Sequence, residues 1–199
     1  MDSGKAGTRR VNRDSERIYD EFLVSAAVTG DQAAMARLVA RWQPRLVRHA
    51  WRLIGDAEKA KDMAQEAWME ILRGLARLDD TAAFPAWAYR IATRRCQREF
   101  HRRDREILVP EHEDADADAD ARAQLHESDT GESAVELSIV MGEIASLPGP
   151  QRAALALFYI EGLSVAEIAI ATDVPPGTVK TRLMHARRKV RATLEGNAS

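Results

Sequence analysis

The sequence predicts an all-α protein of two small helical domains, an N-terminal helical bundle and a C-terminal helix-turn-helix domain, joined by a flexible acidic linker. Over residues 16–105 and 134–195, apolar residues recur at steps of three and four, the spacing of helices that bury one face. No segment alternates as a half-buried strand does. Residues 106–133 carry ten acids against one arginine and cannot bury an apolar face, so they form the linker. Residues 1–15 are polar and are expected to be a disordered N-terminus.

The N-terminal region is expected to contain four helices, over residues 16–28, 31–54, 57–78 and 85–103. Pro44 is expected to kink or interrupt the second of these helices, because proline lacks the backbone N–H that a helix interior uses. Gly55 is a natural C-cap for the same helix, and Asp56 can cap the start of the next one. Pro85 suits the first helical position of the fourth helix.

The C-terminal region contains the signals of a helix-turn-helix. One helix is expected to end before Pro148, and another to cover residues 151–161. Ser164 can then cap a short helix, with Glu167 three residues later to complete a capping box. After the Pro-Pro-Gly break at residues 175–177, the next helix starts at about Thr178.

This last helix has two different faces. Its buried stripe follows steps of four, three and four residues: Val179, Leu183, Ala186 and Val190. The opposite face carries hydroxyls and cations, and suits a DNA major groove flanked by phosphates. The alternative is an ordinary helical hairpin whose basic face contacts only water.

A net charge of −2 hides a strong segregation of charge along the chain. Seven arginines and two acids lie between Phe84 and Arg105, and six cations with no acid lie between Thr178 and Arg191. The acidic residues 106–133 separate these basic blocks. The chain therefore has two basic surfaces that could meet nucleic-acid phosphates, although it is nearly neutral as a whole.

Several classes of protein are excluded by what the sequence lacks. No apolar run approaches the roughly 20 residues that span a bilayer, and the N-terminus lacks the apolar core of a signal peptide, so no membrane insertion is expected. The single cysteine, Cys96, indicates a reducing cytoplasm and is expected to be chemically passive. No spacing of metal ligands or catalytic groups occurs, so we expect no metal, no cofactor and no enzyme activity.

The third expected helix has an unusual outer face. Four of its residues lie three or four positions apart and form one exposed patch: Asp62, Gln65, Glu66 and Met69. Carboxylates, an amide and a thioether do not suit DNA phosphate but do suit a basic protein surface. Alone, this pattern is also typical of a solvated helix face.

Four segments occur in an order that is typical of one bacterial family. Residues 62–67 match the pattern D-x-x-Q-E, and residues 84–92 are similar to F-x-x-W-L-Y-x-I-A. Residues 147–152 resemble the L-P-x-x-x-R opening of a C-terminal domain, and residues 162–188 resemble a promoter-reading helix-turn-helix. Together the segments resemble a sigma factor of the extracytoplasmic-function (ECF) group, over about residues 20–104 and 134–195.

The resemblance implies a function for each surface. The N-terminal domain would bind core RNA polymerase and would recognise and melt the −10 element, and the C-terminal domain would read the −35 element. The polymerase would be bound by Asp62, Gln65, Glu66 and Met69. The −10 DNA would be contacted by Leu78, Asp79, Asp80, Thr81, Trp87, Tyr89, Arg94, Arg95, Arg98, Arg102 and Arg103. The −35 DNA would be contacted by Thr178, Lys180, Thr181, Arg182, His185 and Arg188.

Two aromatic residues of the −10 set have a structural alternative. Trp87 at this spacing is more often a core residue, and Tyr89 fits a core position and a base-stacking position equally well. The chain also departs from the family where many relatives have asparagine, because Thr93, Arg94 and Arg95 stand there. Arginine cannot accept a hydrogen bond as asparagine does, so the sequence does not predict the preferred −10 base.

The resemblance further implies an anti-sigma factor that covers the polymerase-binding surfaces, and promoter DNA and polymerase as the other partners. Two alternatives remain at this point. A helix-turn-helix regulator that takes no part in initiation would not need the acidic patch around Asp62. An enzyme or metal-dependent sensor in the N-terminal bundle would need convergent ligands.

Overall fold

The described part of the chain is helical, as expected. The computed structural model describes the backbone of residues 3–107 and 141–197, and the side chains of residues 14–100 and 141–192. Within these ranges every regular element is a helix, and an N-terminal and a C-terminal helical unit are present. Most of the predicted linker, residues 108–133, lies outside the described residues.

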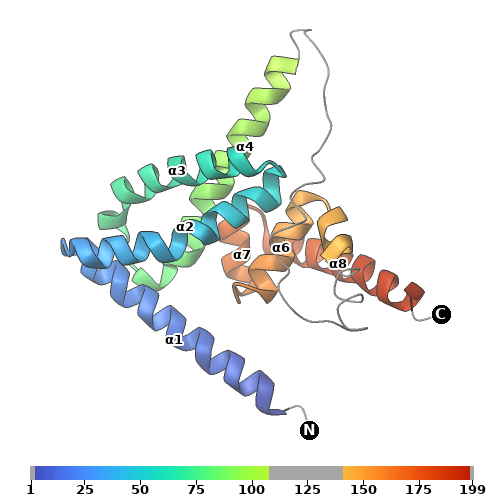
Figure 1. Ribbon diagram of the computed structural model, residues 1–199, viewed down its shortest axis with the longest axis horizontal. Helices are drawn as coiled ribbons and strands as arrows, with labels where there is room; N and C mark the ends of the chain where they lie inside the picture. Colours follow the sequence, from blue (N-terminus) through green and yellow to red (C-terminus); the bar gives the residue numbers. More distant parts are fainter. Residues whose placement is uncertain (1–2, 108–140, 198–199) are drawn as a thin grey trace.

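Four long helices and two short 3₁₀ turns build the N-terminal unit. They are α1 (Ser3–Val28), α2 (Gln32–Ile54), α3 (Ala57–Gly74), η1 (Leu75–Arg77), η2 (Thr81–Ala83) and α4 (Phe84–Ile107). Helix α2 packs against α1, α3 and α4, and α3 also packs against α4 (Figure 1). Trp42, Phe84 and Tyr89 fill the centre and are each at most 1% exposed. Trp42 contacts Phe84 edge-on, with ring centroids 5.0 Å apart.

Local capping signals in this unit form as predicted. Gly55 adopts the left-handed conformation, with φ 82°, and its N–H bonds to the carbonyl of Trp51. Asp56 accepts a hydrogen bond from the backbone N–H of Lys59 at 3.0 Å. Asp31 caps α2 by accepting from the backbone N–H groups of Ala33 and Ala34. These short-range bonds fix where α2 and α3 begin and end.

Several features predicted for these helices differ from the structure. Helix α1 begins at Ser3, within the residues predicted to be disordered, because no proline interrupts residues 3–28 and a nucleated helix can propagate through them. Pro44 lies inside a continuous α2, and packing of the apolar face of this helix outweighs one lost backbone bond. Helix α3 ends at Gly74, before residue 78, and the chain continues directly into the 3₁₀ turn η1. Trp87 lies so close to Gly74 that a Cβ there would be 2.9 Å from its ring.

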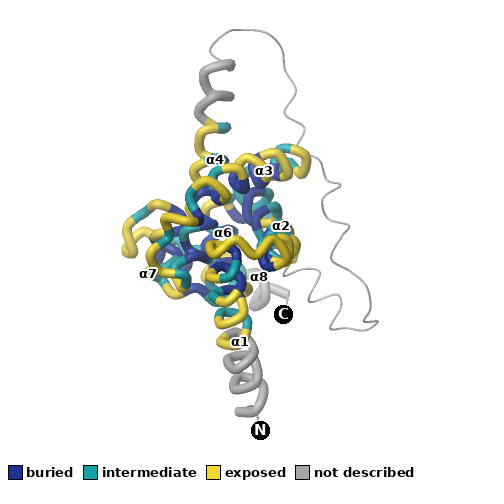
Figure 2. The backbone as a smooth tube through the Cα atoms, turned by 90° about the vertical axis from the view of Figure 1, so that its left-hand side faces the viewer, coloured by how far each residue is buried: buried dark blue, intermediate teal, exposed yellow. Residues whose placement is uncertain are grey.

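The C-terminal unit consists of a helical segment at residues 141–146 and three further helices. These are α6 (Gly149–Tyr159), α7 (Val165–Thr172) and α8 (Pro176–Asn197). Helix α8 packs against α6 and α7. The unit also rests on the N-terminal bundle, with α7 along α4 and α6 against α2, so that buried segments of both units meet in the middle of the molecule (Figure 2).

Candidate functional site

The exposed side of α3 presents a mixed acidic and apolar surface. Asp62, Gln65, Glu66 and Met69 are all exposed, as predicted for one helix face. Leu72, one turn beyond Met69, is 49% exposed although it is apolar. The sequence analysis missed Leu72, although Leu72 follows Met69 by three residues and this spacing predicts that both lie on one helix face. These five residues are called the α3 outer face below.

One acid of the α3 outer face is tied to the basic helix beside it. The guanidinium of Arg95 on α4 donates to Glu66 at 3.2 Å and, through Nε, to Glu70 at 3.1 Å. The side chain of Arg95 is only 23% exposed. Arg95 was predicted to contact −10 DNA, but in this structure its guanidinium holds α4 against α3 and orients Glu66.

The loop before α4 combines capping and exposed groups. Asp80 accepts a hydrogen bond from the backbone N–H of Ala82 at 2.9 Å and so caps η2. Asp79 is exposed beside it, whereas Leu78 packs partly against the core and Thr81 is half-buried. Of these four predicted contacts, Asp79 presents the freest side chain to a ligand.

The two aromatic residues of α4 lie inside the bundle to different degrees. Trp87 is half-buried, next to Phe84 and the close-packed Gly74. Tyr89 is 0% exposed, and its ring lies 5.4 Å from Trp42. Burial, followed by the nearby carboxylate of Glu161, raises the pKa of Tyr89 well above its ordinary value. Tyr89 therefore does not lie on the surface where a base could stack on it in this arrangement.

A row of arginines runs along the outside of α4. Arg90, Arg94 and Arg98 are exposed at steps of four residues and thus share one face. Arg90 was not among the predicted contacts, although it precedes Arg94 by four residues and this spacing predicts that both lie on one helix face. Arg102 and Arg103 belong to the last turns of α4, but their side chains lie outside the described residues. Three charges along one helix face suit a nucleic-acid backbone.

Helices α7 and α8 form the predicted helix-turn-helix. The Ser164 hydroxyl accepts from the Glu167 N–H at 3.2 Å, and the Glu167 carboxylate accepts from the Ser164 N–H at 2.7 Å. Both halves of the capping box are therefore present. Asp173 ends α7 in the left-handed conformation, with φ 55°, and turns the chain toward α8. Aspartate tolerates this conformation better than most residues.

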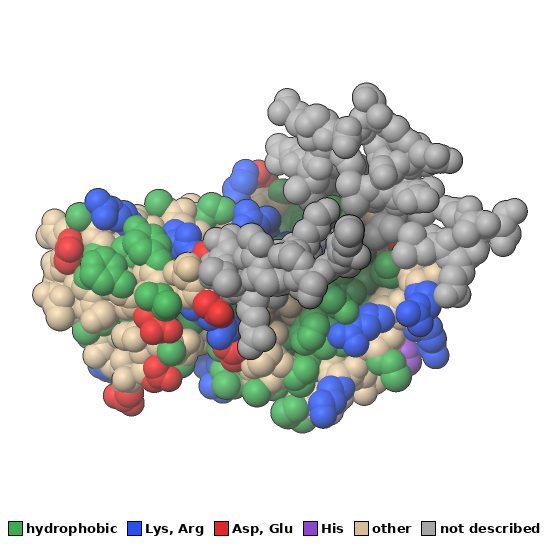
Figure 3. All heavy atoms as spheres, turned by 90° about the horizontal axis from the view of Figure 1, so that it is seen from below, with side chains coloured by type: hydrophobic (Ala, Val, Ile, Leu, Met, Phe, Trp, Pro, Cys, Tyr) green, Lys and Arg blue, Asp and Glu red, His purple; other side chains and the backbone are tan. Residues whose placement is uncertain are grey.

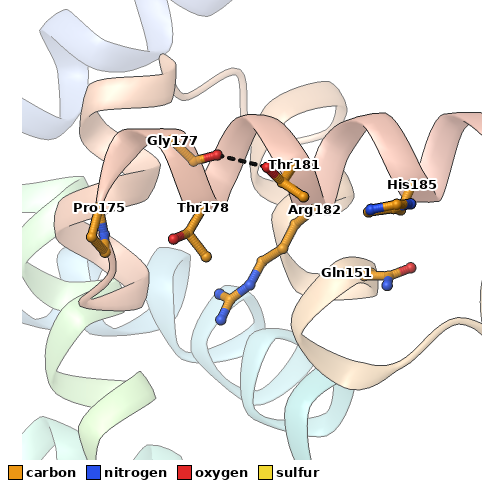
Figure 4. Close-up of a pocket in the computed structure, with 7 residues that line it drawn as sticks. All are labelled: Gln151, Pro175, Gly177, Thr178, Thr181, Arg182 and His185. Atoms are coloured by element: carbon orange, nitrogen blue, oxygen red, sulfur yellow. Dashed lines mark hydrogen bonds between the residues drawn. The ribbon is translucent and has the colours of Figure 1, made fainter.

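The first turns of α8 present most of the predicted −35 contacts on one side, with Lys180 on another side of the helix. Thr178, Lys180 and Thr181 are exposed, and Arg182 and His185 are partly exposed. Figure 4 shows Thr178, Arg182 and His185 lining an open hollow, with Gln151 of α6 beside them. Burial lowers the pKa of Arg182, but a guanidinium stays protonated at neutral pH. A helix that begins at such a hollow can present side chains to base edges.

Other cations of α8 are used within the unit. The guanidinium of Arg187 lies 5.3 Å from the ring centre of Phe158 and 5.5 Å from that of Tyr159. Lys189 lies 3.4 Å from a carboxylate oxygen of Glu143. Arg188, by contrast, is exposed and hydrogen-bonds to His185 at 3.2 Å, on the predicted DNA side. Seen from below, acidic side chains lie mostly at the end away from α8, together with basic ones, whereas the α8 end shows mainly basic and apolar side chains (Figure 3).

Known proteins match this chain over both units. The family model of Sigma-70 region 2 matches residues 38–106, and that of Sigma-70 region 4 matches residues 137–190. The ECF RNA polymerase sigma-E factor of Escherichia coli is 33% identical over 189 residues, which cover 88% of this chain and 94% of that protein. This chain belongs to the ECF sigma factors. The RNA polymerase sigma-H factor of Pseudomonas aeruginosa is 31% identical over 185 residues, with the same coverage.

Two solved structures share the fold of this sigma factor. One is the sigma factor RpoE in complex with the anti-sigma factor NepR from Bartonella quintana, with 22% identity and a TM-score of 0.65 over 81% of this chain and 96% of that one. The other is CnrH in complex with the cytosolic domain of CnrY, with 22% identity and a TM-score of 0.57 over 89% and 98% of the chains.

Family membership decides between the alternatives left by the sequence. Sigma factors are initiation factors without catalytic activity of their own, so the chain is not an enzyme. A helix-turn-helix regulator unconnected with initiation is likewise set aside. Among the described residues, no three histidine, cysteine or acidic side chains are grouped as a metal site would require. No helix in the described ranges is long and apolar enough to span a membrane.

Proposed function

We propose that this sigma factor binds core RNA polymerase through the α3 outer face. In support of this, Asp62, Gln65 and Glu66 match the family's polymerase-binding segment, and they are exposed together with Met69. Leu72 adds an exposed apolar side chain that a protein partner can bury. Polymerase and sigma factor work in the bacterial cytoplasm, which is where we place this chain.

The −10 element is assigned to the loop at residues 78–83 and to α4. Bases that leave the duplex can be held by loop groups such as Asp79, while Arg94 and Arg98 bind the displaced strand's phosphates. Arg90 joins them as the third member of the row. Tyr89 can contact a base only after the groups that cover it have moved.

The −35 element is assigned to the first turns of α8. The outward position of Arg182, with Thr178 and His185 along the same hollow, supports this assignment. An arginine can pair with guanine through two hydrogen bonds, and hydroxyls can bind phosphate or base edges. Lys180, Thr181 and Arg188 complete the set.

An anti-sigma factor is proposed as the regulator. The two solved relatives named above were each captured with such a partner. The separation of an acidic polymerase-binding face on α3 from the basic faces on α4 and α8 is the observation that carries the whole assignment. It leaves one protein surface and two DNA surfaces available on a single chain.

Transcription in vitro tests this assignment directly. The double variant Asp62→Ala/Gln65→Ala should lose promoter-specific transcripts with core polymerase, because two contacts to the polymerase are gone. Gln32→Ala is the control, since Gln32 is exposed on α2 and lies outside the α3 outer face. A double variant that folds normally yet transcribes as well as wild type would contradict docking through α3.

A further inference from the structure

Arg95 joins the basic helix α4 to the acidic side of α3. Its guanidinium donates through Nη1 to Oε2 of Glu66 at 3.2 Å and through Nε to Oε2 of Glu70 at 3.1 Å. A third hydrogen bond runs from Nη2 to Glu70. One cation therefore contacts two carboxylates of the neighbouring helix, and these three side chains are called the Arg95 bridge below.

The side chain of Arg95 is set apart from the other arginines of α4. Arg90, Arg94 and Arg98 form an exposed row at steps of four residues. Arg95 follows Arg94 by one residue, so it lies about 100° further round the helix. Its side chain is 23% exposed and faces α3. A DNA phosphate could reach this guanidinium only by displacing two carboxylates that already bind it.

The bridge leaves Glu66 available to a partner. Glu66 and Glu70 are four residues apart, so they lie on one side of α3, where their like charges repel each other and the cation of Arg95 offsets the repulsion. The Glu66 side chain is 50% exposed although one of its oxygens is bonded. A carboxylate has about four acceptor positions, so Glu66 can also bind a cation of another protein.

Holding Glu66 in advance favours its binding to a partner. An exposed glutamate on a helix has several rotamers, and it loses this freedom when a partner immobilises it. The hydrogen bond from Arg95 restricts the Glu66 carboxylate before the partner arrives. Glu70 binds the rest of the guanidinium and keeps Arg95 itself in place. A side chain restricted in this way loses less entropy on binding.

We propose that Arg95 is a positioning residue of the polymerase-binding surface, which holds Glu66 for a basic group of core polymerase and makes no contact with promoter DNA. The proposal rests on the proposed docking of polymerase on the α3 outer face. It gives Arg95 an effect opposite to the one that its charge alone would have. A basic partner is repelled by the charge of Arg95 and gains only from the orientation of Glu66.

The affinity of the full-length sigma factor for core polymerase tests this role by the sign of one effect. Arg95→Ala makes the side of α3 more negative, which by charge alone would strengthen binding to a basic surface. Losing the hold on Glu66 should instead weaken core binding about tenfold, within the range for residues joined in one hydrogen-bond network. Arg37→Ala is the control, since Arg37 is exposed on α2 and belongs to none of the assigned surfaces. Unchanged or tighter binding by Arg95→Ala would overturn the proposal.

A double-mutant cycle shows whether Arg95 acts through Glu66. Glu66→Ala alone should weaken core binding, and Arg95→Ala should then cause no further loss in the Glu66→Ala background. An equal loss from Arg95→Ala in both backgrounds would show that Arg95 acts by another route, such as the general stability of the bundle. That result would overturn the positioning role.

Arg95→Lys separates geometry from charge without removing the cation. Lysine has a single ammonium in place of the planar fork, so it cannot hold both carboxylates as arginine does. Arg95→Lys should melt close to wild type and yet bind core several-fold more weakly. Core binding equal to that of wild type would show that a positive charge is sufficient there and would overturn the positioning geometry.

Promoter binding by holoenzyme at saturating core polymerase tests the second half of the proposal. Each lost phosphate contact reduces the slope of log affinity against log salt concentration by about one. Arg98→Ala should reduce this slope, and Arg95→Ala should not. A reduced slope in Arg95→Ala would overturn the exclusion of Arg95 from DNA binding.

Failure of the proposed function would give a different pattern of results. If Asp62→Ala/Gln65→Ala and Glu66→Ala all bind core as wild type does, polymerase does not dock on the α3 outer face, and the role of Arg95 is overturned with it. If those variants lose affinity and Arg95→Ala does not, the docking surface stands and the positioning role alone is wrong.

Discussion

Buried polar side chains show how strongly single residues depend on their surroundings here. His49 is 0% exposed, and one of its ring nitrogens, Nε2, lies 2.8 Å from the hydroxyl of Thr93 on α4. Burial, and then the positive charge of Arg52, lower the pKa of His49 to about 3. The imidazole is therefore neutral in the folded protein throughout the physiological range. Thr93 serves as a hydrogen-bond partner inside the bundle.

The free energy of unfolding should consequently fall as the pH drops from about 6.5 toward 3. In this window the unfolded chain protonates His49 and the folded chain does not, so stability is complete above pH 6.5 and is lost progressively below it. One such group gives a slope of at most about 1.4 kcal/mol per pH unit. Urea unfolding of wild type and His49→Gln between pH 7 and pH 4 measures it. Identical slopes for the two proteins would contradict a neutral, buried His49.

Sequence reasoning succeeded for residues whose roles are local. Gly55, Asp56 and Ser164 act through hydrogen bonds within a few positions of themselves, and their patterns are visible in the chain. It did not reveal the packing partners of Arg95 and Tyr89, because Glu70 and Trp42 are distant from them in sequence. An arginine on a basic helix looks the same in sequence whether it meets phosphate or a neighbouring carboxylate.

At the scale of elements, periodicity predicted which helices exist and which faces they bury, but not where each one ends. Pro44 did not break α2, because packing of the apolar face of this helix outweighs one lost backbone bond. Helix α3 changed into a 3₁₀ turn at Leu75, which periodicity does not distinguish from a continued α-helix. Periodicity also does not separate the cations of α8 by role. Arg187 packs on aromatic rings within the unit, whereas Arg182 is proposed to contact DNA.

The two kinds of cation on α8 should separate by mutation. Arg182→Ala should weaken promoter binding by the holoenzyme about 5- to 150-fold, as expected for one lost base-reading pair of about 1–3 kcal/mol. Arg187→Ala is the internal control: it removes the stacking on Phe158 and Tyr159, and should lower the melting temperature while leaving promoter affinity within about twofold. Equilibrium binding at one fixed salt concentration measures both. The opposite ranking of the two variants would contradict the assigned DNA face.

At the scale of the whole molecule, charge segregation predicted two basic surfaces suited to DNA, and the family match agrees that the chain binds promoter DNA. The packing of the two units against each other was not predictable in this way. Gly149 reads as part of a Pro-Gly-Pro break, and only the folded chain brings it against Leu53 of the other unit. Contacts between the two units leave no periodic signal of their own, because each contacting surface has the same sequence pattern as an ordinary buried helix face.

A shared core has a thermodynamic consequence that calorimetry can detect. Leu157 and Ile168 of the C-terminal unit belong to the same buried cluster as Leu38 and Phe84, so neither unit can unfold without exposing apolar surface of the other. Wild type should therefore melt in one cooperative transition. Gly149→Ala should melt in two, with the less stable unit unfolding first, whereas Gly142→Ala should keep the single transition. Two transitions already present in wild type would mean that each unit is stabilised by its own core alone. The contacts between the units would then add too little free energy to couple their unfolding.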